Sequence, residues 1–255
     1  MAISLVLLVI LFILMAIIGG GKGMKSFFML CLNFAILFYV LALIAKDYDP
    51  IKTTVCGCIV ITSATLIYIN GFNKKTVSSI LAVSITVLIT MSIIYKMGVD
   101  SKIQGFSAEE IDSIGYLSLS YNVNLNFMKI FICQVLVGLL GAIIDTSISI
   151  SSPINEIYNN NKDITKYDLF KSGMNIGRDI LGTMTNTLLF VYIGSFMSLI
   201  LYFNVLNYSA SEIINRKVFA AEVFQVLCSG IGVVLIIPIT AFITTEILYM
   251  KKWEK

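Results

Sequence analysis

The stretch MKIFICQVLVGLLGAIIDTSISI, residues 128–150, is almost entirely apolar and carries one acidic residue, Asp145. A helix rises about 1.5 Å per residue, so a run of this length spans the roughly 30 Å hydrocarbon layer of a bilayer. Further apolar runs of comparable length lie at residues 2–18, 26–45, 53–70, 76–97, 180–206 and 218–249. The sequence therefore predicts an all-α polytopic membrane bundle of about seven transmembrane helices, forming one domain over residues 1–255.

The composition supports lipid as the solvent of this chain. Of its 255 residues, 58% are hydrophobic and 13% are charged, whereas soluble domains carry about 25% charged residues. The run at 2–18 has neither the charged start nor the small-residue cleavage site of a secretory signal. We therefore expect it to be retained as the first transmembrane helix.

The distribution of lysine and arginine predicts the orientation, because cytoplasmic loops are enriched in both residues. Eleven of them follow the odd-numbered spans or lie in the tail: Lys22, Lys25, Lys74, Lys75, Lys162, Lys166, Lys171, Arg178, Lys251, Lys252 and Lys255. Seven lie on the other side: Lys46, Lys52, Lys96, Lys102, Lys129, Arg216 and Lys217. This split favours an N-terminus outside the cell and a cytoplasmic C-terminus.

Two connections are longer than the others. Residues 98–127 form the expected extracytoplasmic connection, in which a capping box at 107–110 opens an amphipathic helix that runs to Leu117 and lies at the membrane interface. Residues 151–179 form the expected cytoplasmic connection, where Gly173 and Gly177 indicate a bend before the sixth span.

A small and polar stripe surrounds the acidic residue of the fifth span. Gly138, Gly141, Asp145, Ser149 and Ser152 follow one another at helical spacing and therefore share one face. Small residues allow a second backbone to come close, and an acid in hydrocarbon persists mainly where it faces the bundle interior or water. We interpret Gly138, Gly141 and Ser149 as helix-packing positions.

The sixth span offers a polar face toward this stripe. It carries Thr183, Thr185 and Asn186, with Gly182 as a further packing position and Arg178 at its start. If the fifth and sixth spans are antiparallel, the carboxyl group and these side chains lie level with each other. Burial and neighbouring hydrogen-bond donors shift a carboxyl pKa in opposite directions, which is the chemistry of proton carriage. The alternative is a structural hydrogen-bond cluster that fixes helix packing.

Other classes of site are disfavoured by the sequence. The five cysteines all lie in apolar runs and there is no histidine, so we expect no disulfide framework, no metal site and no cofactor. An enzyme is not expected either, because a histidine base, a nucleophile turn and a second deep carboxylate are all absent. Without a basic soluble domain, nucleic acid is an unexpected partner.

Two segments of the second half resemble the YibE/F family of bacterial membrane proteins. They are GAIID at 141–145 and FKSGMNIGRDILGTMTNT at 170–187. The length of the chain is similar to the YibF type, which implies a YibE-like partner subunit and a multi-pass location in the bacterial plasma membrane. The order of an acidic helix, a threonine-rich helix and a final helix with PITAFITTE at 238–246 is also similar to the membrane half of RND-superfamily proteins of the SecD and SecF type. In those, the matching acid and hydroxyls take part in proton coupling.

These observations lead to two hypotheses of function. In the first, the chain is an integral membrane subunit of a transport system, coupled to protons through Asp145. In the second, it is a noncatalytic assembly subunit that positions a YibE-like partner, or a second copy of itself, through the small-residue stripe and the 107–117 helix.

Overall fold

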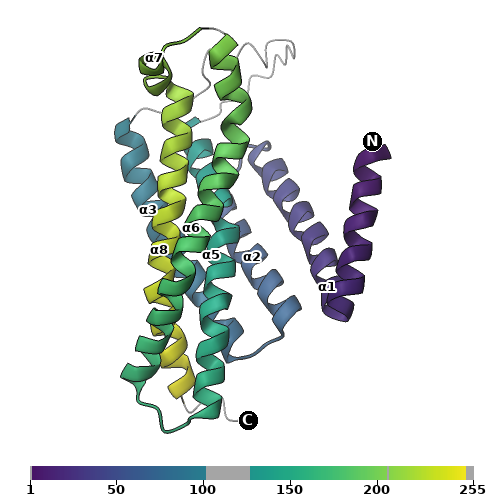
Figure 1. The fold of residues 1–255 in the computed structure, drawn as a ribbon, viewed down its shortest axis with the longest axis vertical. Coiled ribbons are helices and arrows are strands. Elements are labelled where there is room, and N and C mark those ends of the chain that lie inside the picture. Colours follow the sequence, from purple (N-terminus) through teal and green to yellow (C-terminus); the bar gives the residue numbers. More distant parts are fainter. Residues whose placement is uncertain (1, 102–126, 206, 251–255) are drawn as a thin grey trace.

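The structure is a computed structural model that describes residues 2–101, 127–205 and 207–250. Within these residues all regular secondary structure is helical, which confirms the all-α prediction. The helices are α1 (Ala2–Ile44), α2 (Pro50–Asn70), α3 (Lys74–Ser101), α5 (Phe127–Asn160), α6 (Lys166–Val205), α7 (Ala210–Ile214) and α8 (Lys217–Tyr249) (Figure 1). In the described part of the chain, α1, α2, α3, α5 and α8 are long and apolar enough to cross a membrane.

The helix α5 is the centre of the bundle and contacts α2, α3, α6 and α8. It runs in the same direction as α8, while α3 and α6 run in the opposite direction (Figure 1). The largest apolar core lies where α3, α5 and α8 meet, and it includes the buried side chains of Val83, Leu139 and Ile236. A second core near the lower end in Figure 1 joins α5, α6 and α8 around Ile154 and Leu169.

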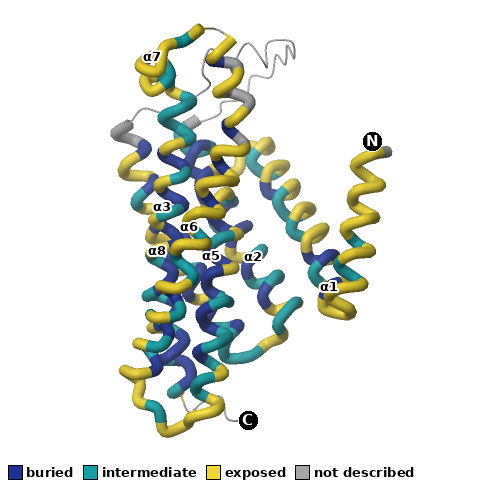
Figure 2. Tube along the Cα trace, in the orientation of Figure 1, coloured by how far each residue is buried: buried dark blue, intermediate teal, exposed yellow. Residues whose placement is uncertain are grey.

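The helix α1 is folded into a hairpin that stands beside the bundle (Figure 1). The fold occurs at Gly20, whose φ of 53° and ψ of −136° are accessible to glycine and strained for other residues. The two arms then come close: a Cβ on Gly23 would lie 1.8 Å from the carbonyl oxygen of Met15, and the rings of Phe12 and Phe27 lie 4.9 Å apart. None of residues 3–18 is buried, and the first arm is yellow along most of its length in Figure 2.

Ion pairs and lysine contacts show which helix ends lie together. At the end of the bundle that carries α7, Lys129 at the start of α5 forms a 2.6 Å ion pair with Asp49, the residue before α2. At the opposite end, Lys75 at the start of α3 donates a 3.1 Å hydrogen bond to Ser152 of α5. Lys166 at the start of α6 pairs there with Glu246 near the end of α8 at 3.0 Å.

Helices cover most of the connection expected over residues 151–179. The helix α5 continues through Pro153 to Asn160, and α6 begins at Lys166. At Gly173 and Gly177, where a bend is expected, the helix α6 is unbroken and both glycines are buried against other helices. In the expected 98–127 connection, α3 extends to residue 101, and the amphipathic helix expected at 107–117 lies outside the described residues.

Candidate functional site

Asp145 lies on an open face of α5, together with Gly138 and Gly141. All three residues are exposed in the single chain. The Asp145 carboxylate makes no hydrogen bond and no ion pair with any residue that the structure describes. A carboxylate near the centre of a membrane helix costs about 2.5 to 3.5 kcal/mol to insert, so contact of this face with lipid alone is unfavourable.

The polar face of α6 lies at about the same height as Asp145. The antiparallel helices α5 and α6 are in contact on both sides of this height, at Ile154 with Gly173 and at Gly138 with Tyr192. Asp145 lies between the two contact positions of α5, and Thr183 lies between those of α6. The geometry thus places the acid and the threonine level with each other, as the antiparallel arrangement predicts.

The hydroxyl groups on that face are bonded to their own helix. The Thr183 hydroxyl donates a 2.8 Å hydrogen bond to the carbonyl oxygen of Ile180, and the Thr187 hydroxyl donates one of 2.8 Å to the carbonyl oxygen of Thr183. Thr185 and Asn186 are exposed. Among the described residues, no hydrogen bond joins these side chains to the carboxyl group on α5.

Arg178 lies outside this group. Its side chain is exposed, and its closest polar partner is the Asn175 side chain, with 3.5 Å between Nη1 and Oδ1. The neighbouring Asp179 is exposed as well. Arg178 and Asp179 come earlier in α6 than the residues that lie level with Asp145. In the single chain, Arg178 therefore does not contact the Asp145 carboxylate.

The glycines expected to pack helices differ in what surrounds them. A Cβ on Gly138 would lie 2.9 Å from Nε2 of Gln225 and 3.0 Å from the hydroxyl of Tyr192. Gly141 and Gly182 have no atom within 4 Å of that position. Gly138 therefore makes room for side chains of α6 and α8, while Gly141 and Gly182 are open on the surface of the single chain.

The polar groups beside Gly138 form a chain that sequence reasoning missed. Nε2 of Gln134 donates to Oε1 of Gln225 at 3.3 Å, and Nε2 of Gln225 donates to the hydroxyl of Tyr192 at 3.4 Å. The Tyr192 hydroxyl is also bonded to that of Ser229 at 3.0 Å. The signal in the sequence is one glutamine in each of two apolar runs, since an amide in hydrocarbon requires a partner.

A second polar group, also missed, lies inside the core of α3, α5 and α8. Its hydroxyl pairs are Ser79 with Ser151 at 2.7 Å, Ser147 with Thr240 at 3.1 Å and Ser78 with Thr244 at 3.1 Å. All six side chains are completely buried. They satisfy one another, so this cluster holds the three helices together.

The lower part of the α5 stripe is less open than the upper part. Ser149 and Ser152 are half-buried. The Ser152 hydroxyl accepts its hydrogen bond from Lys75, which ties this part of the stripe to the start of α3. The stripe therefore runs from an open region at Gly141 and Asp145 to a closed region at the end of α5.

The described residues provide few groups of side chains that could bind a metal ion. No three side chains of histidine, cysteine, aspartate or glutamate come together there. The five cysteines are unpaired, and Cys58, Cys133 and Cys228 are buried among apolar groups.

Long apolar helices, a hydroxyl-bonded core and a polar face on α5 together define a helical protein of the membrane class. The model of the YibE/F-like protein family matches residues 7–250, and the chain belongs to that family. Neither the curated proteins nor the solved structures contain a significant match to this chain.

Proposed function

We propose that this chain is an integral membrane subunit of a transport system in the bacterial plasma membrane, and that Asp145 takes up and releases a proton at an interface with another chain. The observation that supports it best is the exposure of Asp145 without a partner among the described residues. A carboxyl group in the apolar layer marks functional sites in membrane proteins, because lipid alone does not compensate its charge.

The second chain is part of the proposal because the single chain leaves the site incomplete. Thr183 is level with the acid but donates its hydroxyl hydrogen to its own helix. Gly141 of α5 and Gly182 of α6 are both open in the single chain and allow another backbone to approach closely. A YibE-like subunit or a second copy of this chain would then supply polar groups or a water-filled space next to the carboxyl group.

The membrane topology proposed with this function has seven crossings, two of them by the arms of α1. The N-terminus is then outside and the C-terminus is cytoplasmic, as the lysine distribution favours. The end of the bundle with Lys75 and Lys166 is the cytoplasmic end. Labelling of single cysteines at positions 47 and 163 with an impermeant maleimide tests this, since only the first is expected to react in intact cells.

The test of proton coupling uses the chain purified gently from its own membrane with whatever subunit accompanies it. In vesicles with a pH gradient and an internal pH-sensitive dye, we expect Asp145→Asn to abolish proton flux and Asp145→Glu to retain part of it. Glu246→Gln, which removes a carboxylate at the cytoplasmic end, is the matched control. Equal flux in the Asp145→Asn and unsubstituted proteins would contradict the role of Asp145.

A noncatalytic assembly subunit is the second candidate, and it is favoured by the open positions at Gly141 and Gly182. Under this alternative, Asp145→Asn keeps both the accompanying subunit and the transport activity of the assembly. Gly141→Leu, by contrast, removes the accompanying subunit because a large side chain keeps the second backbone away. Measuring flux and co-purification in the same two variants separates the candidates.

A further inference from the structure

The face of α5 that carries Asp145 continues as a line of polar side chains toward the end of the helix. Ser149, Ser152 and Glu156 follow Asp145 at intervals of four, three and four residues, so all of them share this face. At 1.5 Å per residue, neighbouring members of the line are about 4.5 to 6 Å apart along the helix axis. Two carboxylates therefore lie on one side of α5 with two hydroxyl groups between them.

Ser149 has hydrogen-bonding groups that the chain itself does not use. Its side chain is half-buried, and its hydroxyl makes no hydrogen bond with any residue that the structure describes. Its carbonyl oxygen also lacks the usual helix donor, because Pro153, four residues later in the unbroken α5, has no N–H group. Backbone groups that proline releases in membrane helices are satisfied by neighbouring side chains or by ordered water. Ser149 is therefore a favourable position for water.

The next hydroxyl of the line, that of Ser152, is oriented by Lys75. The Lys75 ammonium donates a 3.1 Å hydrogen bond to the Ser152 hydroxyl oxygen. An ammonium group has donors only, so the serine oxygen must accept and its own hydrogen remains to be donated. No residue in the described part of the chain accepts that hydrogen. Ser152 can therefore donate to a water molecule on the side of Ser149.

Glu156 is the member of the line that reaches solution. It is exposed and forms no ion pair with the described residues. It follows Ser152 and its partner Lys75, at the end of the bundle that is cytoplasmic in the proposed topology. An exposed carboxylate exchanges protons with bulk water, and carboxyl groups are common donors and acceptors in proton transfer. Glu156 is therefore suited to take up protons at this end.

In the opposite direction along α5, this face has no comparable line. Gly141 and Gly138, which lie between Asp145 and the α7-bearing end, have no polar side chain. The next polar residue of the face is Gln134, about 16 Å from Asp145 along the axis. One water molecule with two hydrogen bonds of about 2.8 Å bridges roughly 5.6 Å, so this gap is much longer than the steps toward Glu156. Along this face, polar groups lead from Asp145 to one end of the bundle.

We propose that protons reach Asp145 from the cytoplasmic end along this line of side chains. The path rests on the proposed role of Asp145 and adds the side from which that residue is reached. Glu156 takes a proton from solution, and water molecules held by Ser149 and Ser152 pass it on, each hydroxyl accepting one proton at its oxygen and giving up its own. The Asp145 carboxylate becomes a carboxylic acid, and Glu156 and both serines return to their starting forms.

The uptake step is tested by proton flux in inside-out membrane vesicles that contain the chain with whatever subunit accompanies it. At low buffer concentration, we expect Glu156→Gln to lose most of the flux. Adding the impermeant buffer MES to the medium is expected to restore it, because a mobile proton carrier replaces a surface carboxylate but does not repair a damaged fold. Glu246→Gln is the matched control and keeps the flux, since Glu246 lies at the same end but is paired with Lys166.

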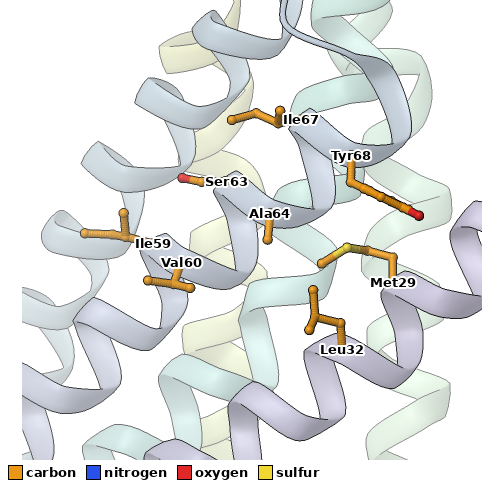
Figure 3. A pocket seen from close by; sticks show the side chains of 8 residues that line it. All are labelled: Met29, Leu32, Ile59, Val60, Ser63, Ala64, Ile67 and Tyr68. Carbon is orange, nitrogen blue, oxygen red and sulfur yellow. The ribbon is translucent and has the colours of Figure 1, made fainter.

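The relay step is tested by removing one hydroxyl. Ser149→Ala is expected to lower the flux about fivefold, the effect of one lost hydrogen bond, whereas Ser149→Thr keeps a hydroxyl and most of the flux. The matched control is Ser63→Ala in α2. Ser63 is likewise half-buried and makes no hydrogen bond with the described residues. It lines a groove of about 490 Å³ between α1 and α2, and none of the described residues that line this groove is charged (Figure 3).

The outcomes separate this path from the role of Asp145 itself. Flux that requires Asp145 but is unchanged in Glu156→Gln and Ser149→Ala would overturn the path and leave the role of Asp145 in place. A loss of flux in Glu156→Gln that external buffer does not restore would also overturn the path alone. Flux that is absent, or that is equal in Asp145→Asn and the unsubstituted protein, would overturn both.

Discussion

The hydroxyl oxygens of Ser79 on α3 and Ser151 on α5 lie 2.7 Å apart, and neither side chain is exposed. The pair joins two antiparallel helices inside the protein, where both side chains are closed to solvent. Together with the pairs that reach α8, it makes the core of this bundle partly polar. Hydrogen bonding of this kind stabilises helix contacts in a membrane, where apolar burial alone gives little preference for protein over lipid.

A double-mutant cycle on this pair is expected to show coupling. Ser79→Ala and Ser151→Ala each leave one buried hydroxyl without its partner, so we expect an interaction free energy of about 0.6 to 1.7 kcal/mol, the range for interhelical bonds in membranes. The measurement is reversible unfolding in mixed micelles. Thr187→Ala, at an exposed position of α6, is the control and should change the stability by less than about 0.5 kcal/mol. Additive effects of the two serine variants would contradict the coupling.

The contact between α6 and α8 depends on Gly177. A Cβ at this position would lie 2.2 Å from Cγ2 of Ile237, so Gly177→Ala forces the helices apart and is expected to destabilise the protein by about 1 to 3 kcal/mol. Gly182→Ala introduces the same methyl group on the same helix at an open position. It should be neutral or stabilise the helix by up to about 1 kcal/mol. Thermal unfolding of the two variants in one detergent compares them directly.

The hairpin of α1 should be sensitive to substitution at Gly20 and tolerant at Gly19. Gly20→Ala places a side chain at a φ of 53° and is expected to cost about 1 to 3 kcal/mol. Gly19→Ala is the matched control, because no atom lies within 4 Å of its Cβ position. Cysteines at Phe12 and Phe27 report the geometry through cross-linking with a short reagent. An unchanged cross-linking yield in Gly20→Ala would show that the turn does not need this glycine.

Acid should weaken the attachment of α2 to α5. A hydrogen bond from Lys129 holds the pKa of Asp49 below its ordinary value of about 3.9. Because the folded-state pKa is the lower one, the pair contributes its full stability at neutral pH and loses it as the pH falls through the folded-state value. We expect Asp49→Asn, which keeps a helix-capping side chain, to lower stability by under about 1 kcal/mol at neutral pH and to have no effect in strong acid.

The control for this prediction is Asp47→Asn in the same connection. Asp47 forms no ion pair with the described residues, so its substitution removes a carboxylate from the same connection without breaking the Lys129 pair. Equal pH dependence in Asp49→Asn and the unsubstituted protein would mean that the Lys129 pair does not contribute to stability. Chemical unfolding at several pH values is the required measurement.

The all-α fold could be predicted because the length and polarity of the apolar runs leave few alternatives in a membrane. In the described part of the chain the expected runs lie on helices, except that the run at 26–45 ends one residue beyond α1, and Gly20 separates the first two runs. Helix ends were harder to predict, since polar residues such as Asn155 and Asp168 lie in helices that extend beyond the apolar layer. Glycine has two uses, a turn or a close contact, and sequence spacing does not distinguish them at Gly173 and Gly177.

The candidate site could be predicted only in part. Helical spacing correctly groups Gly138, Gly141 and Asp145 on one face, because that follows from backbone geometry alone. Spacing does not show which neighbour covers the face. It also does not show that Thr183 donates its hydroxyl hydrogen to its own backbone, a local bond that competes with any partner on another helix. Pairs between helices, such as Ser79 with Ser151, depend on how two helices far apart in the sequence are aligned along each other. Helical periodicity within one segment does not predict that alignment.

The position of α8 between α3 and α5 has a consequence for biogenesis. During synthesis, α3 and α5 leave the ribosome well before α8, so Ser78 and Ser147 reach the bilayer without Thr244 and Thr240. Until the last helix inserts, both hydroxyls keep only their hydrogen bonds to carbonyl oxygens of α3, at Lys75 and Ser79, and face lipid or the insertion machinery where α8 will pack. A chain that stops before α8 therefore leaves the Ser78 and Ser147 hydroxyls on an uncovered face of α3 and α5.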